Sequence, residues 1–370
     1  MENLSQLLEK YRLGKCTEKE LEMINFYFHH FELEGNVVPS EKELTEIKAD
    51  IWSAVQPGKS QLWKLWLKIG IAAAVAVIIL SIGLYFNNTT SLLVKPQAVQ
   101  RVIGPGRNAA TLILADGRKI KLGDTSLMAV KSDGGNLATA SANKLTYATQ
   151  GLSQEVNTLT TARGEQFAVE LPDGTEVWLN SASTLVYETN INAQVQRSVR
   201  LQGEAYFQVA KNKDRPFLVQ TDNQVIEVLG THFNVSSYAA DGLAATTLLE
   251  GSVKVRANAG AVVILKPGEQ AELKAQVLKV RAVNTAYVMS WKDGFFMFDN
   301  EELVSVMNKI ARWYDVKVIY RSEAVKKETF FGTISKSKTV NKVLEHLALT
   351  KTVSFDVEGS IIYVGPPDKH

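Results

Sequence analysis

The segment VIEVLGTHFNVSSY, at positions 225–238, decides how the middle of this 370-residue chain folds. Its side chains alternate like those of a β-strand over residues 225–229, with successive residues on opposite faces. The alternation stops at Gly230-Thr231 and then resumes. The segment therefore predicts two β-strands separated by an irregularity. That irregularity is either a β-bulge or a bond that the protein cleaves in itself.

The chain around this segment continues in the same way. From residue 99 to about residue 283 it consists of short alternating runs separated by turn residues, the pattern of an all-β sandwich or roll. Two near-repeats, TLILADGRKIKL (111–122) and FAVELPDGTEVWL (167–179), each place an Asp-Gly pair between two strands, as hairpins do. We predict an all-β domain over residues 159–285, preceded by a linker and a first β hairpin over residues 87–158.

After Trp291 the pattern changes to strands that alternate with helices. The runs FFMF, VKVIY, FFGTIS, VSFDVE and SIIYVG are typical of strands, and LVSVMNKIARWY and TVNKVLEHLAL of amphipathic helices. Helix residues such as Met307 and Trp313 are expected in the core rather than in contact with a ligand. The order β-α-β-β-α-β-β predicts a small α+β domain over residues 290–370.

The strongest single signal is WKLWLKIGIAAAVAVIILSIGLYF, at positions 63–86. Residues 69–86 are 18 consecutive residues without a charge, which as a helix nearly span a hydrocarbon core of ~30 Å. Lysines lie on the N-terminal side of the segment, and the first basic residue after it is Lys95. We therefore predict one transmembrane helix, with residues 1–62 in the cytoplasm and residues 87–370 outside it.

Residues 1–62 show three short helical patterns, whose single apolar faces make a thin core that needs a partner. Residues 1–60 hold eleven acidic and seven basic residues, and this net charge of −4 disfavours direct binding to DNA. His29 and His30 are adjacent, so on a helix they point in different directions and do not suggest a metal site.

Motifs of common enzymes are missing from the sequence. There is no glycine-rich phosphate loop, no HExxH and no GxSxG. The single cysteine, Cys16, excludes an intramolecular disulfide. We expect no cofactor, no metal ion and no multi-turnover enzyme, and a single self-cleavage event is the one reaction left open.

Five motifs follow one another in the β region: LPDGTEVWLN (171–180), LQGEAYFQV (201–209), VLGTHFNV (228–235), TTLLEGSV (246–253) and KPGEQA (266–271). In this order they resemble the FecR family, membrane-spanning anti-sigma regulators of Gram-negative bacteria. ARWYDVKVIY (311–320) and the elements after it look like the extra C-terminal domain of one branch, which is similar to the secretin/TonB-type signalling domain. The resemblance covers about residues 160–370 closely. The first 60 residues match mainly in length, helicity and position.

The resemblance implies a function that agrees with the predicted topology. The cytoplasmic helices would bind an extracytoplasmic-function sigma factor. The periplasmic part would receive a signal from the periplasmic signalling domain of a TonB-dependent outer-membrane receptor, with residues 290–370 in contact with that domain. The protein would be a single-pass protein of the inner membrane and serve iron or carbohydrate uptake. The surplus apolar residues that could contact the sigma factor are Leu8, Tyr11, Phe26, Tyr27, Phe31 and Trp52.

Some members of the family are also cleaved between Gly and Thr at the position of VLGTHFNV. The implied reaction is attack of the Thr231 hydroxyl on the carbonyl of Gly230, followed by hydrolysis of the resulting ester. A bulge required by the fold explains the same residues without chemistry. Two other functions stay open: a membrane-anchored periplasmic binding or scaffold protein with no role in transcription, and a self-processing or hydrolytic enzyme.

Overall fold

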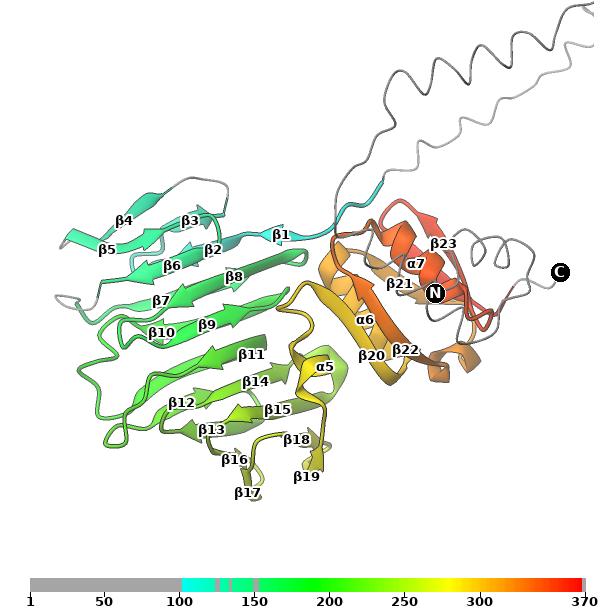
Figure 1. Cartoon of the computed structure of the whole chain (residues 1–370). Coiled ribbons are helices and arrows are strands. Elements are labelled where there is room, and N and C mark those ends of the chain that lie inside the picture. The colour runs from blue at the N-terminus through cyan, green and yellow to red at the C-terminus, as the bar shows by residue number, and fades with distance from the viewer. Residues whose placement is uncertain (1–101, 124–126, 133–134, 149–152, 368–370) are drawn as a thin grey trace, which may run out of the picture. The chain divides into compact units, whose positions relative to one another are not determined.

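The computed structural model describes residues 102–123, 127–132, 135–148 and 153–367 (Figure 1). All described residues belong to one compact unit, in which a β-sandwich is followed by a smaller α+β part.

Two β-sheets form the sandwich, and strand β11 (Arg197–Gln208) belongs to both. The other strands of the first sheet, sheet I, are β2 (Ala110–Ile113), β3 (Lys119–Leu122), β7 (Val156–Thr161), β10 (Ser183–Glu188), β12 (Phe217–Gln220), β13 (Gln224–Val228), β16 (Val253–Ala257) and β17 (Val262–Leu265). Those of the second sheet, sheet II, are β4 (Met128–Ser132), β5 (Gly135–Ala140), β6 (Lys144–Tyr147), β8 (Glu165–Glu170), β9 (Glu176–Leu179), β14 (His232–Ser237), β15 (Leu243–Glu250), β18 (Glu269–Lys274) and β19 (Val277–Ala282).

Strand order follows from the ladder pairings. Sheet I runs β3-β2-β7-β10-β11-β12-β13-β16-β17, and sheet II runs β4-β5-β6-β8-β9-β11-β14-β15-β18-β19. Most neighbours are antiparallel, but β11 pairs with β12 in parallel, and β6 and the short β1 (Arg107–Asn108) both pair with β8 in parallel. The strands before residue 148 are therefore part of the same sheets as the strands after it.

The sandwich core forms because each strand turns alternate residues inward. In β13, Ile226 and Val228 are buried, whereas Val225 and Glu227 are half-exposed. Strand β11 pairs with sheet I up to Gln202 and with sheet II from Gly203 onward. It thereby joins the two sheets around one continuous apolar cluster.

A second core lies in the α+β part. Its elements are β20 (Phe295–Glu302), α6 (Leu303–Tyr314), β21 (Lys317–Tyr320), the short 3-10 helix η2 (Ala324–Lys327), β22 (Thr329–Ser335), α7 (Val340–Ala348), β23 (Ser354–Glu358) and β24 (Ile361–Gly365). Strand β20 pairs with β22, and β24 lies between β21 and β23. The apolar faces of α6 and α7 close this core. The short helix α5 (Thr285–Met289) connects the sandwich to this part.

The predicted fold class, a multidomain membrane protein with an N-terminal helical unit and a transmembrane helix, is wrong for this structure. The described residues are mostly β-sheet with three α-helices, α5, α6 and α7. None of these helices is long and apolar enough to cross a membrane, because none exceeds the 12 residues of α6. The predicted helical unit (1–62) and transmembrane helix (63–86) lie outside the described residues.

Candidate functional site

The Gly230–Thr231 peptide lies between β13 and β14, and backbone hydrogen bonds hold it on both sides. The N–H of Val209 donates to the carbonyl of Thr231 at 3.0 Å, and the N–H of Asn212 donates to the carbonyl of Leu229 at 2.8 Å. These two bonds fasten the chain on either side of the Gly230 carbonyl to the loop that follows β11.

The space around this peptide requires glycine at two positions. Gly230 has a φ of +142°, which side chains of L-residues rarely allow, and a Cβ there would lie 2.6 Å from Cα of Lys211. A Cβ on Gly251 would lie only 2.3 Å from Cγ2 of Thr231. The Thr231 methyl group can occupy its position only because Gly251 lacks a side chain, and the chain can pass Lys211 only because Gly230 lacks one.

The hydroxyl of Thr231 is buried without a hydrogen bond. The residue is 5 % exposed, and its Oγ1 has no partner in the part of the chain that the structure describes. Leaving a buried polar group unpaired costs about 1–3 kcal/mol. The other two Gly-Thr pairs differ, because Thr175 Oγ1 donates to Asp173 Oδ2 at 2.8 Å and Thr333 is exposed. Among the three pairs, only Gly230-Thr231 has a hydroxyl that is both buried and free of a competing bond.

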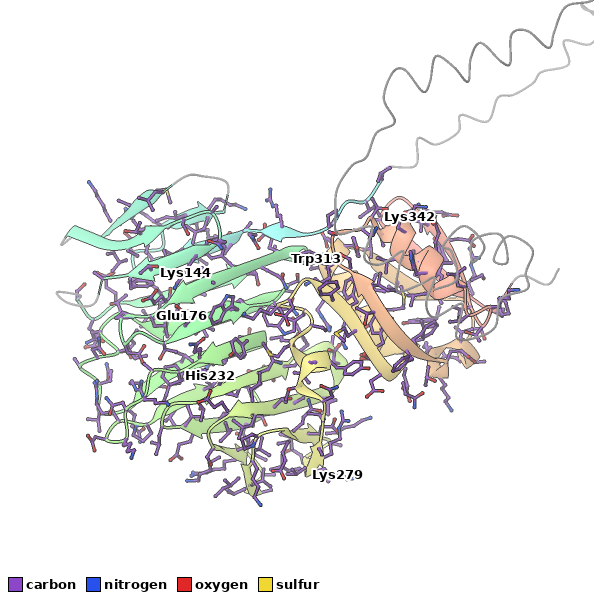
Figure 2. All side chains as sticks on the ribbon, viewed as in Figure 1. Lys144, Glu176, His232, Lys279, Trp313 and Lys342 are labelled. Atoms are coloured by element: carbon purple, nitrogen blue, oxygen red, sulfur yellow. The ribbon has the colours of Figure 1, made fainter. Side chains whose placement is uncertain are left out.

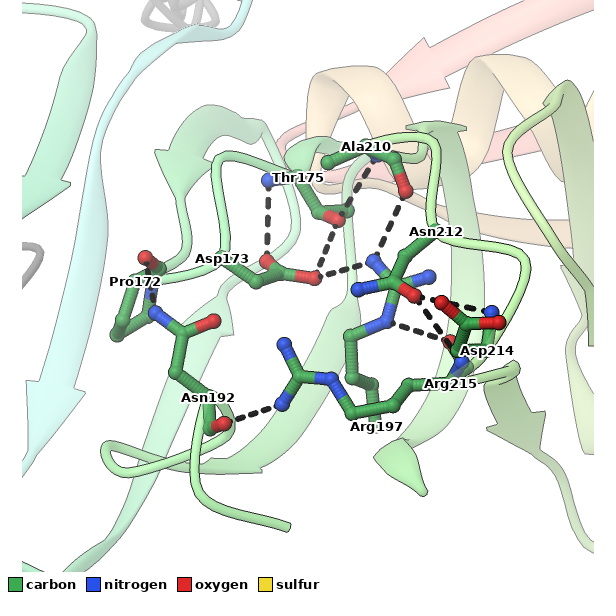
Figure 3. Close-up of polar contacts among 9 residues, drawn as sticks. All are labelled: Pro172, Asp173, Thr175, Asn192, Arg197, Ala210, Asn212, Asp214 and Arg215. Carbon is green, nitrogen blue, oxygen red and sulfur yellow. Dashed lines mark hydrogen bonds and ion pairs between the residues drawn. The ribbon is translucent and has the colours of Figure 1, made fainter. Parts of the chain in front are cut away.

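A buried ion pair anchors the loop that packs against this peptide (Figure 3). Arg197 and Asp173, whose side chains are 1 % and 3 % exposed, meet at 2.9 Å between Nη1 and Oδ2. The guanidinium also donates to the carbonyls of Ala210 at 2.9 Å and Arg215 at 3.0 Å. The N–H of Ala210 in turn donates to Thr175 Oγ1 at 3.2 Å. The loop after β11 is therefore tied firmly to the turn between β8 and β9.

His232 does not contact the threonine hydroxyl. Its ring is 33 % exposed, and Nδ1 lies 3.4 Å from Oε2 of Glu250 on the neighbouring strand. The register of β14 with β15 shifts between His232 and Phe233, so a bulge follows the Gly-Thr peptide directly. The bulge accounts for the break in alternation, but it does not account for a buried hydroxyl without a partner.

Helix α6 is docked on the sandwich through charged side chains. Arg312 Nη1 donates to both carboxylate oxygens of Asp241, at 3.0 and 3.1 Å, and Asn308 Nδ2 donates to Oδ1 at 3.0 Å. The guanidinium also lies 3.9 Å from the ring centroid of Tyr238. Burial raises the pKa of the Tyr238 phenol well above its usual range, which keeps the ring neutral beneath the cation. The side chains of Arg312 and Asp241 are only 13 % and 24 % exposed, so solvent screens this ion pair less than a surface pair.

The C-terminal end of α6 is capped from the sandwich by Arg163. Its Nη2 donates to the carbonyls of Ala311 at 2.7 Å and Val316 at 2.8 Å, and its Nε donates to Asp315 Oδ1 at 3.0 Å. A cation at a helix C-terminus also interacts favourably with the helix dipole. Both the face and the end of α6 are thus held by the sandwich.

Lys336 is buried where the two cores meet. It is 3 % exposed, its Nζ donates to the carbonyl of Trp291 at 3.0 Å, and the ammonium lies 3.8 Å from the ring centroid of Trp313. Burial lowers the pKa of this amine from 10.5 to about 7, and the nearby carboxylate of Glu204 opposes the shift only in part. The group is therefore near its titration point at neutral pH.

A cleft of about 480 Å³ opens beside this lysine, between sheet II and α6. Its floor is a polar network in which Glu204 accepts bonds from Asn180 Nδ2 at 2.8 Å and Asn234 Nδ2 at 3.0 Å. Trp291 Nε1 completes the network with a bond to Asn234 Oδ1 at 3.2 Å. No cluster of metal-binding side chains occurs here or elsewhere among the described residues.

The residues proposed to contact the sigma factor lie outside the described residues: Leu8, Tyr11, Phe26, Tyr27, Phe31 and Trp52. Sequence reasoning also missed Arg197, Arg312 and Lys336, because their partners are distant in the chain. For the Arg197 ion pair, the only local signal was its partner Asp173, and the hairpin pattern already explains Asp173 as a turn residue. Lys336 lies in the polar run SKSKT and nothing in that pattern marks it as buried.

Two family profiles match the chain. The profile of the FecR protein matches residues 157–254, and that of the FecR C-terminal domain matches residues 295–364. The chain belongs to the FecR family. The resemblance seen in the sequence is thereby confirmed, and Gly230-Thr231 lies within the first FecR match.

Two crystal structures of a candidate anti-sigma factor from Parabacteroides distasonis ATCC 8503, at 1.65 and 2.50 Å resolution, are similar to this FecR-family chain. Each is 27 % identical with a TM-score of 0.54; they cover 57 % and 58 % of this chain and 99 % and 100 % of their own. No curated protein matches the chain. Family and neighbours together support a role in the regulation of sigma-factor signalling.

Proposed function

We propose that this chain is an anti-sigma regulator that binds an extracytoplasmic-function sigma factor through residues 1–62. In this proposal the described region receives a signal from the periplasmic domain of a TonB-dependent outer-membrane receptor. The corresponding location is the inner membrane, with the N-terminus in the cytoplasm and the C-terminus in the periplasm. Membership of the FecR family is the observation that carries the proposal.

The docked helix α6 suggests how a signal could travel within the described region. Residues 290–370 are the expected contact for the receptor, and α6 belongs to them. Arg312, Asn308 and the Arg163 cap hold this helix against the sandwich that contains the Gly-Thr peptide. A receptor domain that binds to α6 would therefore weaken or strengthen these hydrogen bonds and the ion pair before it affects the rest of the sandwich.

Self-cleavage at Gly230-Thr231 is the second part of the proposal. Thr231 Oγ1 attacks the carbonyl carbon of Gly230, the C–N bond breaks, and the hydroxyl proton passes to the released amine. Water then hydrolyses the ester, which leaves a carboxylate on Gly230 and a free amine and hydroxyl on Thr231. The supporting observation is the buried, unbonded hydroxyl described above. A threonine without a competing hydrogen bond is available for this attack.

Capture of tagged full-length chain from its native cells tests the sigma-factor proposal. The expected result is an extracytoplasmic-function sigma factor in the eluate, absent when residues 1–62 are deleted. An exchange of Phe31 and Trp52 for aspartate should also remove it, whereas Phe331→Asp, at an exposed aromatic of the C-terminal part, should not. An eluate without a sigma factor would leave a membrane-anchored binding or scaffold protein.

Immunoblots of the same cells test the cleavage proposal. Wild-type chain should give two fragments that meet at residues 230 and 231, and Thr231→Val should give only intact chain. Thr175→Val is the matched control, because Gly174-Thr175 has the same composition but a bonded hydroxyl. Cleavage that persists in Thr231→Val would rule out the acyl shift.

A further inference from the structure

As far as the structure describes it, each sheet of the sandwich ends on both sides in a strand with one unpaired edge: β3 and β4 at one end, β17 and β19 at the other. Among the described strands, β17 pairs only with β16 and β19 only with β18, so each is the last strand of its sheet. The two strands lie close together at the same end of the sandwich (Figure 1). Their outer edges therefore carry backbone N–H and C=O groups without a ladder partner among the described residues.

Aliphatic side chains gather at this end. Val262 and Ile264 on β17 are 47 % and 67 % exposed, and Val277 and Val280 on β19 are 55 % and 42 % exposed. Val280 is two residues from Leu278, which packs against the sandwich core, so both lie on the core-facing side of β19. A side chain on the core side that remains 42 % exposed indicates that the sandwich lacks cover here.

The same end is strongly basic. Residues 253–282 contain six basic and two acidic residues, a net charge of +4, whereas the whole chain carries only +2. On β19, Lys279 and Arg281 both point to solvent, and Figure 2 shows Lys279 at the tip of the sandwich. One of the two carboxylates, Glu272, already pairs with Arg281 at 2.7 Å.

We propose that the free edge of β19 is a docking site for an extended, acidic segment of another polypeptide, which adds a strand to sheet II. Strand addition uses the unpaired backbone groups, and alternate residues of the added strand would cover Val277 and Val280 on the two faces of β19. Acidic residues in the remaining positions would complement the basic end. Lysine on an edge strand usually serves to prevent pairing with another chain. The exposed aliphatic residues beside Lys279 do not serve that purpose, because they favour such pairing.

A second copy of the chain fits this edge poorly. Two copies of β19 paired antiparallel would bring Lys279 and Arg281 of both copies together, and like charges opposite each other destabilise a sheet. An anionic membrane would satisfy the charge but not the backbone groups. The site also lies outside residues 290–370, although Lys274 and Arg281 line the cleft beside α6.

Binding of labelled nonapeptides to the full-length chain tests the proposal. The probe alternates valine and glutamate, one control peptide alternates valine and lysine, and a second replaces internal valines with proline, which has no N–H to donate. Fluorescence anisotropy should show saturable binding of the first peptide only. No binding of the valine-glutamate peptide, or equal binding of the proline peptide, would overturn strand addition.

Variants locate the site. Lys274 lies on β18 directly opposite Val277 of β19, beside Lys279. Lys274→Gln with Lys279→Gln should weaken binding of the valine-glutamate peptide at least fivefold, while Lys338→Gln with Lys342→Gln, in the C-terminal part, should leave its affinity unchanged. Val280→Ser tests the apolar contribution separately. It should weaken binding of the valine-glutamate peptide, because the added strand loses its apolar contact with Val280. Equal affinity in all variants would refute the site. Sedimentation with phosphatidylglycerol vesicles that depends on Lys274 and Lys279, without peptide binding, would instead indicate a lipid surface and overturn the proposal.

Discussion

Replacing Lys336 with methionine should change how the stability of the protein depends on pH. The amine has a pKa of about 7 in the folded chain and an ordinary value of 10.5, with burial as the main cause. Since each pKa unit corresponds to about 1.4 kcal/mol, protonation of the buried amine opposes folding by about 5 kcal/mol.

The sign follows from proton binding. Between about pH 7 and pH 10.5 the unfolded chain holds a proton on Lys336 that the folded chain has released. The free energy of unfolding therefore rises with pH across this window, and the penalty is fully present below it. Methionine has a similar length and no titratable group, so this contribution to the slope disappears in Lys336→Met.

Urea unfolding of the full-length chain at pH values between about 6 and 10 measures the effect. Between about pH 7 and 9.5 the stability of wild type relative to Lys336→Met should rise by about 3 kcal/mol. At the low end the methionine variant should be the more stable one. The methionine variant loses the hydrogen bond to the Trp291 carbonyl and the contact with Trp313, worth about 1 kcal/mol each. These losses do not follow the pH dependence of the burial penalty, and together they are smaller than that penalty.

Lys338→Met is the matched control, since Lys338 is an exposed lysine on the same segment. Its curve should run parallel to that of wild type. Parallel curves for Lys336→Met as well would refute the reasoning, because they would mean that Lys336 has the same protonation in the folded and unfolded chain.

Three further outcomes follow from the buried groups. Arg197→Met should lower the free energy of unfolding by about 3–5 kcal/mol, because it leaves Asp173 buried without its cation; a loss below about 1 kcal/mol in urea unfolding would contradict this. Thr231→Val should raise the free energy of unfolding by about 1–3 kcal/mol, because it removes the unpaired hydroxyl, whereas Thr175→Val should lower it by about 1–3 kcal/mol, and the reverse order would show that the Thr231 hydroxyl is bonded. Arg312→Met should speed cleavage by trypsin in the segment between sandwich and α6, and an unchanged cleavage rate would show that its pair with Asp241 does not hold the helix.

Parts of the described fold could be read locally. The alternation over residues 225–229 overlaps β13 up to residue 228, and Asp116-Gly117 and Asp173-Gly174 lie in the turns of hairpins. These features depend on neighbouring residues, so a short window contains the needed information. The break in the pattern at Gly230 likewise corresponds to a local feature, its φ of +142°.

Other parts could not be read this way. The parallel pairing of β6 with β8, and the division of β11 between two sheets, join residues that no local pattern relates. The burial of Lys336 likewise depends on Trp291 and Trp313, which come from other elements. Each of these results from long-range packing, which overrides local polarity.

The sequence by itself determined the family, the strand-rich character of the described region and the Gly-Thr position worth testing, because motifs and alternation are properties of adjacent residues. Only the tertiary structure decided which Gly-Thr hydroxyl is buried without a bond, which ion pair is desolvated and which sheet edge stays open. The physical reason is that burial, hydrogen bonding and edge exposure are set by which distant segments pack together, and the strength of each polar group depends on that environment.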